Sequence, residues 1–199
     1  AGRTEQEIYG KLGLKYMEPE LRENTGELQA SLKNKLPKLI TIKDINGIFH
    51  CHSDWSDGKN TMLEMAQRAE AMKLKFISFN DHYSSIGILN PLTEKRMKGY
   101  LKAIEKVQKK VGLKIFSGIE IDIQKDGSLL PISKSILREL DIVVAAVHTS
   151  LGLPEAEMTA RICKALENYP INVLAHPTCV RYGEREGIAV NLEKVFETA

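Results

Sequence analysis

The chain has 199 residues, of which 43% are hydrophobic and 27% charged, and its formal net charge is +2 at neutral pH. This is an ordinary globular composition, and the balanced charge alone gives no reason to expect nucleic-acid binding. No apolar run is long enough to cross a membrane, and the first residues lack the apolar stretch of a secretory signal. The three cysteines are widely spaced without a CxxC pair, which favours reduced thiols in a cytoplasmic protein over disulfides.

Residues 1–46 are polar and weakly patterned, whereas the rest of the chain alternates between two kinds of segment. Short helices are expected at 5–13 and 25–35. The strands expected after them are 48–52, 76–81, 113–123, 141–148 and 171–176. The helices expected between them are 62–72, 93–111, 133–139, 155–168 and one beginning near residue 191. This alternation predicts an α/β domain with a parallel sheet, either doubly wound or closed into a barrel.

Histidines mark the C-terminal ends of these strands. The five in the chain are His50, His52, His82, His148 and His176. In parallel α/β domains such strand ends meet on one face, where active sites are built. A single histidine there would more often be structural, but five together favour a metal centre. His50 and His52 lie two residues apart and should share one strand face, whereas Cys51 should point into the core.

Carboxylates near the first two strand ends add to the candidate site. The loop SDWSDG after His52 is typical of a turn, and Asp57 can fold back over the strand end. Asp54 is the competing candidate, with an exposed or turn-capping role as its alternative. Asp81, at the end of the second strand, is expected either to orient an imidazole or to cap a turn.

Glu120 and Asp122 alternate with isoleucines on strand 113–123, so both lie on one of its faces. Glu120 among histidines would bridge two ions, and Asp122 could be a buried hydrogen-bonding residue. Imidazole and carboxylate ligands suit Zn²⁺, Mn²⁺ or Fe²⁺. The candidates exceed what one tetrahedral ion can use, so at least two ions are expected, and clustered divalent ions most often hydrolyse phosphate esters.

Five motifs follow one another along the chain: HCHSDWSDG at 50–58, NDH at 80–82, GIEID at 118–122, VHTS at 147–150 and AHPT at 175–178. This series resembles the PHP (polymerase and histidinol phosphatase) superfamily over most of residues 44–199. The resemblance implies a distorted (β/α)₇ barrel, truncated at its C-terminus, of which about five βα units are present.

The same resemblance implies a site with two or three divalent ions, Zn²⁺ or Mn²⁺ in the first place and Fe²⁺ or Mg²⁺ as alternatives. The implied ligands are His50, His52 and Glu120 for one ion, Glu120, His148 and His176 for a second, and Asp57 and His82 for a third. The catalytic set it implies is His50, His52, Glu120, His148 and His176. A last Asp-x-His motif of the family would complete two of the ions, and this sequence ends before it.

The stretch from Lys11 to Ser53 resembles the segment that joins the polymerase part of bacterial and archaeal family X DNA polymerases to their PHP domain. It implies that 1–46 is a linker from a polymerase domain and that 47–199 is a PHP metallophosphoesterase domain. The implied function is hydrolysis at DNA ends, of the 3′–5′ exonuclease type, in DNA repair. The implied partners are DNA, through its 3′ ends, and the polymerase domain in cis, with no membrane.

Two features leave the substrate open. The family subgroup continues HPTGR, but Cys179 and Val180 stand here, so Arg181 or Arg185 would supply the phosphate-binding cation. The lysines of helix 93–111 could touch a nucleic-acid backbone, although a solvated outer face is the favoured interpretation. The alternatives are a small-molecule phosphatase of the histidinol-phosphatase type and, less favoured, a non-catalytic PHP module.

Overall fold

The computed structural model describes residues 2–85, 87 and 90–199, and the chain forms two compact units, Ala1–Asp44 and Ile45–Ala199. The first unit contains α1 (Glu5–Lys11), α2 (Glu27–Leu32) and 3₁₀ turns at Pro19–Leu21 and Ile42–Asp44. No helix among the described residues has the length and apolar character needed to span a bilayer.

Arg22 holds the first unit together. Its guanidinium donates hydrogen bonds to the Glu5 carboxylate and to the Met17 carbonyl. It also lies over the rings of Tyr9 and Tyr16, at 5.6 and 5.5 Å from their centroids. Cation–π contacts of this kind add to the ion pair, so one side chain joins α1 to the following loop.

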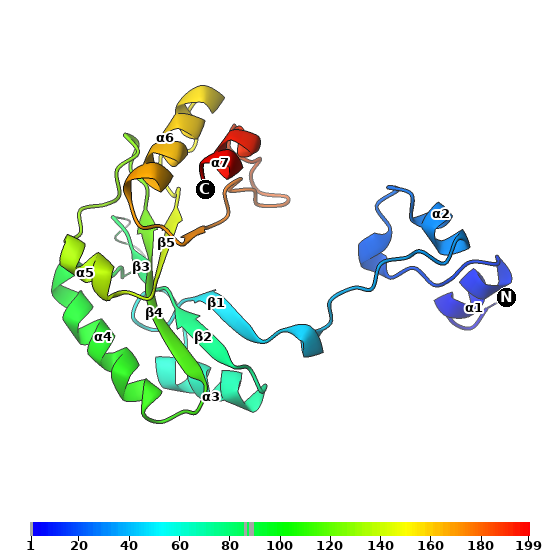
Figure 1. Cartoon of the computed structure of the whole chain (residues 1–199), viewed down its shortest axis with the longest axis horizontal. Coiled ribbons are helices and arrows are strands. Elements are labelled where there is room, and N and C mark those ends of the chain that lie inside the picture. Colours follow the sequence, from blue (N-terminus) through cyan, green and yellow to red (C-terminus); the bar gives the residue numbers. More distant parts are fainter. Residues whose placement is uncertain (1, 86, 88–89) are drawn as a thin grey trace. The chain divides into compact units, whose positions relative to one another are not determined.

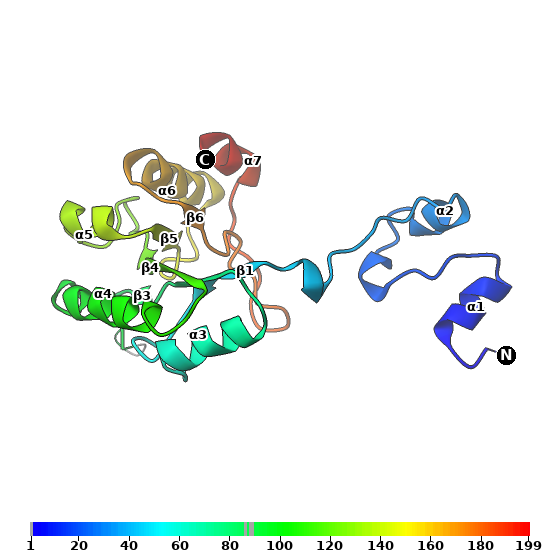
Figure 2. The same ribbon diagram turned by 60° about the horizontal axis from the view of Figure 1, so that its bottom comes forward.

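The second unit is a curled parallel sheet with helices on its outer face (Figures 1 and 2). Its strands are β1 (Gly47–Cys51), β2 (Phe76–Phe79), β3 (His82–Tyr83), β4 (Lys114–Asp122), β5 (Ile142–Ala146) and β6 (Val173–Leu174). Its helices are α3 (Met62–Ala71), α4 (Glu94–Gln108), α5 (Lys134–Glu139), α6 (Glu155–Asn168) and α7 (Leu192–Thr198). The strand order is β1-β2-β4-β5-β6, with β3 also paired to β4. The predicted α/β class is thus confirmed, as a curled sheet consistent with part of a (β/α) barrel.

Two expected strands differ from those observed. The segment expected at 76–81 is observed as β2 and, from His82, β3, which pair in parallel with successive parts of β4. Between them the Asn80 backbone NH donates to the Cys51 carbonyl, and the Asp81 carbonyl accepts from the Glu120 NH. The strand expected at 171–176 is observed as the two residues of β6, and two residues after it the backbone of His176 has a positive φ of 30°. Both interruptions fall beside the candidate site residues.

The two faces of the sheet are both apolar, but they pack differently. Ile115, Ile119 and Ile121 of β4 join the main core with the helices. On the concave face Phe116 packs against buried aliphatic side chains of β5, and its ring lies 6.0 Å from that of Phe49. The helices therefore cover one face of the sheet. The other face is the concave one, from which the side chain of Glu120 reaches the histidines.

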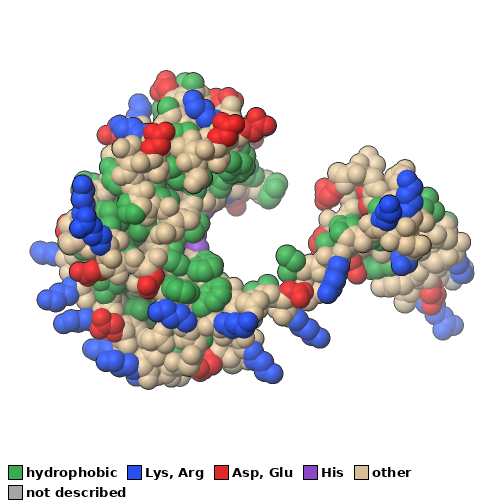
Figure 3. Space-filling model, viewed as in Figure 1, with side chains coloured by type: hydrophobic (Ala, Val, Ile, Leu, Met, Phe, Trp, Pro, Cys, Tyr) green, Lys and Arg blue, Asp and Glu red, His purple; other side chains and the backbone are tan. Residues whose placement is uncertain are grey.

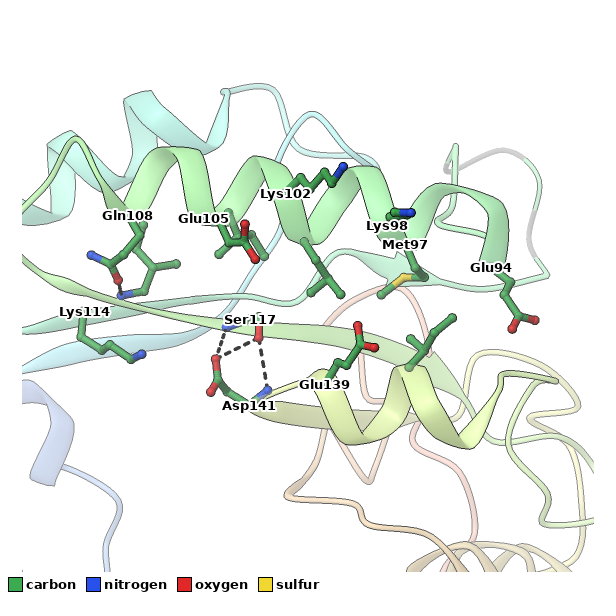
Figure 4. A pocket seen from close by; sticks show the side chains of 14 residues that line it. Glu94, Met97, Lys98, Lys102, Glu105, Gln108, Lys114, Ser117, Glu139 and Asp141 are labelled. Atoms are coloured by element: carbon green, nitrogen blue, oxygen red, sulfur yellow. Dashed lines mark hydrogen bonds between the residues drawn. The ribbon is translucent and has the colours of Figure 1, made fainter.

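The outer face of β4 is partly open between α4 and α5, where a groove of about 720 Å³ is found (Figure 4). On its floor the Ser117 backbone NH and hydroxyl both donate to the Asp141 carboxylate at 2.8 Å. These bonds fix the start of β5 against β4. None of the histidines lines this groove.

Arg161 of α6 joins the ends of β4 and β5. It is 3% exposed and donates to the carbonyls of Gln124 at 2.8 Å and Thr149 at 2.9 Å, and also to that of Ile123. Each carbonyl lies in the segment that follows a strand. One guanidinium therefore satisfies several buried acceptors that no single-donor side chain could reach together.

Replacing Arg161 with Met should lower the free energy of unfolding by about 2–4 kcal/mol, because buried carbonyls lose their donors. Urea denaturation followed by circular dichroism would measure the change. Arg138→Met, at an exposed position of α5, is the matched control and should stay within about 0.5 kcal/mol of the parent. Equal effects of the two substitutions would contradict the bracing role of Arg161.

Candidate metal centre

The carboxylate of Glu120 lies at the middle of the site, on β4, and its side chain is 1% exposed. The nearest nitrogen of each of the five imidazoles lies between 2.9 and 3.5 Å from one of its oxygens. The imidazoles are also close to one another: the distances between the centroids of neighbouring rings range from 4.3 Å for His52 and His82 to 6.2 Å for His50 and His176. The structure thus brings the five histidines together, as their strand-end positions predict.

His50 and His52 reach the site through an irregularity in β1. The pairing of β1 with β2 shifts register between Ile48 and Cys51, and His50 has a φ of 63°. A left-handed backbone is uncommon for a residue with a side chain and is often found at functional sites. The two imidazoles therefore share a face because of this bulge rather than by simple alternation, and Cys51 packs against the main core as expected.

Asn80, the first residue of the NDH motif, supports the site in a way that the motif alone did not predict. Its side-chain carbonyl accepts from the backbone NH of His50 at 3.2 Å and from the Ser78 hydroxyl at 2.6 Å. Asn80 is fully buried. A polar side chain within an otherwise apolar strand was the available signal, because buried amides usually hold a specific partner.

Asp81 anchors the loop that carries Asp57. It is fully buried and accepts hydrogen bonds from the Ser53 backbone NH and hydroxyl, both at 2.8 Å, and from the Ser56 hydroxyl at 2.7 Å. Of the two roles considered for Asp81, it therefore caps the loop rather than orienting an imidazole. Gly58 closes the same loop, where a Cβ would overlap the carbonyl of His52.

Of the two aspartates in this loop, Asp57 faces the imidazoles. Its carboxylate oxygens lie 3.1 Å from His52 Nδ1 and 3.7 Å from His82 Nε2. Asp54 has an exposed side chain, and its backbone NH pairs with the carbonyl of Asn60. The geometry therefore favours Asp57 over Asp54 as a member of the site.

Asp122 fixes the ring of His148. Its Oδ1 lies 2.7 Å from His148 Nδ1, and its Oδ2 accepts from the Ser84 hydroxyl at 2.6 Å. Burial lowers the pKa of His148, but hydrogen bonds to Asp122 and Glu120 outweigh it and raise that pKa to about 9. A carboxylate on one nitrogen leaves the other directed at the site, an arrangement common for metal-binding histidines.

His176 enters from the end of β6 on a backbone with positive φ. Its pKa is raised to about 10 by its interaction with the Cys179 side chain and by Glu120. The Cys179 backbone NH donates to the His176 carbonyl at 2.9 Å, and its thiol donates to the Val147 carbonyl at 3.3 Å. Like Asn80, Cys179 therefore lies beside the site. In the sequence it stood out only as a departure from the HPTGR motif.

The charge of Glu120 is maintained despite its burial. Burial opposes ionisation, but hydrogen bonds from the imidazoles, with His148 and His176 the strongest, hold its pKa well below the ordinary value. Burial, together with neighbouring His82, lowers the pKa of His52 and favours its neutral form. An ionised carboxylate beside neutral imidazole is the chemistry that divalent transition ions require.

Buried imidazole nitrogens without a hydrogen-bond partner also indicate that these residues can hold metal ions. His50 Nε2, His52 Nδ1 and His82 Nδ1 are buried without a hydrogen-bond partner among the described residues, although each lies near a carboxylate oxygen. Buried polar atoms of this kind are costly unless something binds them. Three groups have ligand atoms within 4.8 Å of one another: His50, His52 and Glu120; His52, Asp57 and His82; and His82, Glu120 and His148.

The imidazoles line a cavity of about 650 Å³ that also has Arg181 and Arg185 in its wall. Histidine surface is visible in the hollow of the second unit, between apolar side chains (Figure 3). Arg185 donates to the Cys179 carbonyl at 3.1 and 2.7 Å, whereas Arg181 pairs with Glu184 at 3.3 Å on the surface. Both expected cations therefore reach the wall of the cavity.

Asp57→Asn should weaken Zn²⁺ binding at least tenfold, because it removes a charged oxygen beside two imidazoles, whereas Asp54→Asn should leave binding unchanged. Competition with a chromogenic chelator would measure both variants. Equal weakening by the two substitutions would show that the loop's net charge, and not the position of Asp57, sets the affinity.

A family model described as the PHP domain matches residues 49–188, which include all the candidate ligands. A DNA polymerase/3′-5′ exonuclease PolX of Bacillus subtilis (strain 168) is 32% identical over 197 residues, 98% of this chain and 34% of that protein. A probable phosphatase of Thermoanaerobacter sp. (strain X514) is 28% identical over 144 residues, 70% of this chain and 54% of that protein. This chain thus spans between a third and just over half of these relatives. On the match of the family model, with the site geometry in agreement, the chain belongs to the PHP domain family.

Proposed function

We propose that the protein is a metal-dependent phosphoesterase that hydrolyses phosphodiester or phosphomonoester bonds at DNA ends, as the PHP part of a family X DNA polymerase. The proposal that the substrate is DNA rests on how much of this chain aligns with one relative. The Bacillus subtilis relative aligns with 197 residues and thus with nearly all of the first unit as well as the second. The phosphatase relative aligns with 144 residues. Residues 1–46 are therefore proposed to be a linker from a polymerase domain, and 47–199 the phosphoesterase domain.

The site would hold two or three divalent ions, Zn²⁺ or Mn²⁺, which bind the phosphate oxygens and supply a nucleophile at neutral pH. Glu120 would bridge two of them, with His50 and His52 on one side and His148 and His176 on the other. Its buried, ionised carboxylate and the surrounding nitrogens support this division.

The remaining residues would hold the site and bind substrate. Asp57 and His82 would serve a third ion, since both lie at the same edge of the cluster as His52. Arg181 and Arg185 would bind a phosphate that is not being cleaved, because they line the same cavity as the imidazoles. Asp81 would fix the loop that carries Asp57, and Asp122 would fix the ring of His148.

The principal alternative is a small-molecule phosphatase of the histidinol-phosphatase type, and it is favoured by the names of the shorter relatives. The probable phosphatases of Thermoanaerobacter sp. and of Caldanaerobacter subterraneus subsp. tengcongensis are 28% and 26% identical to this chain over 144 residues. The metal ligands would be the same in both cases. Substrate, not site chemistry, separates the two proposals.

With Mn²⁺, the protein should shorten a single-stranded oligonucleotide from its 3′ end faster than it releases phosphate from histidinol phosphate. Gel analysis of a 5′-labelled oligonucleotide and a phosphate-release assay would measure the two rates. Glu120→Gln should lower both by about 100-fold or more, because the bridging charge is lost.

Glu139→Gln is the matched control, since Glu139 is an exposed carboxylate on α5 that faces the outer groove. It should retain full activity. Activity confined to histidinol phosphate would establish the alternative. No hydrolysis of either substrate by metal-loaded protein would favour a non-catalytic PHP module.

A further inference from the structure

The segment between β6 and α7 contains a short hairpin that forms one wall of the metal cavity. The backbones of Arg181 and Arg185 exchange hydrogen bonds of 3.0 and 2.9 Å. Gly183 makes the turn between them with a φ of 77°. In both ribbon views the segment projects as a loop from the second unit (Figures 1 and 2). Its tip, residues 182–184, is therefore presented outward by a hydrogen-bonded base.

The base of this hairpin is tied to a candidate metal ligand. The Cys179 backbone NH donates to the His176 carbonyl, and the Cys179 carbonyl accepts two bonds from the Arg185 guanidinium. On the other side, the Ile188 NH donates to the Thr178 carbonyl at 2.8 Å. The position of the hairpin is thus set by the same backbone that places the His176 imidazole.

Tyr182 at the tip is 98% exposed, the highest value among the large apolar side chains for which exposure is given. An exposed tyrosine is not unusual by itself, but beside an active-site cavity its ring is free to contact a ligand from outside the chain. A hollow of about 380 Å³ lies against Tyr182. Val180, Arg181 and Arg185 line both this hollow and the metal cavity, so the two spaces adjoin.

We propose that Tyr182 is a stacking platform for an unpaired nucleobase of the strand whose end lies at the metal centre. The inference rests on the proposed action on DNA ends and adds how such an end is held. Proteins that bind single strands combine aromatic rings under the bases with cations along the phosphates, and here Arg181 and Arg185 line the same hollow as Tyr182. Every base has a π face, so this contact favours single-stranded DNA without selecting a sequence.

The charges of the hairpin cancel, so the ring of Tyr182, and not net charge, would select the ligand. Arg181 pairs with Glu184 at 3.3 Å, and both side chains are about two-thirds exposed or more. Such surface pairs are weak, so a phosphate can replace Glu184. Glu184 and Glu186 nevertheless balance the two arginines, and the hairpin carries no net charge to attract a strand by itself. Stacking on Tyr182 is therefore the contact that distinguishes a nucleotide from a bare sugar phosphate.

The test compares two single-stranded oligonucleotides of equal length and charge, one with normal 3′-terminal nucleotides and one with abasic nucleotides there. The wild-type protein with Mn²⁺ should show a KM about tenfold lower for the oligonucleotide that carries bases. Tyr182→Ala should lose this preference by raising that KM about tenfold. Tyr182→Trp should retain the preference, because its ring stacks at least as well.

Phe196→Ala is the matched control, since Phe196 is a 65% exposed aromatic residue on α7 that does not line either hollow. It should keep the wild-type preference. Circular dichroism would confirm that each variant is folded. A folded Tyr182→Ala protein that keeps the preference would overturn the stacking role while leaving the action on DNA ends intact. Wild-type protein that hydrolyses only histidinol phosphate would overturn both.

Discussion

Burying an ionised carboxylate such as that of Glu120 costs several kcal/mol unless donors or cations surround it. In this protein the compensation comes from five histidines, which lie on β1 or just after it, at the start of β3, and after β5 and β6. The parallel order of the strands is what makes this convergence possible, because all their carboxyl ends lie on one side. The sheet topology and the charge at its centre therefore support each other.

A second layer of buried polar residues makes the arrangement rigid. Asn80, Asp81 and Asp122 are each 1% exposed or less, and each holds a different part of the site: the backbone of His50, the loop of Asp57 and the ring of His148. Buried polar groups of this kind restrict movement through the hydrogen bonds that they make. The backbone of His50, the loop of Asp57 and the ring of His148 are each held in this way.

The residue pattern was sufficient to predict the α/β class, the meeting of the histidines and the face of Glu120, because strand periodicity and parallel order determine all three. It did not predict the bulge at His50, the early end of β6 at Leu174 or the backbone of His176, since a positive φ at a histidine depends on tertiary contacts. The part played by Asn80 was also missed. Its partner is a backbone NH of another strand, and no local pattern reveals such a pair.

His50 and His176 stand on β1 and beyond β6, the two edges of the sheet as described here, and these edges do not pair with each other. Their rings nevertheless lie 6.2 Å apart, with the same Glu120 oxygen near both. Edge strands are ordinarily the first parts of a sheet to fray. Here the opening of either edge would pull an imidazole from a shared centre. Bound metal ions would therefore link the two edges of the curled sheet. Loss of the ions would speed the amide hydrogen exchange of both edges together.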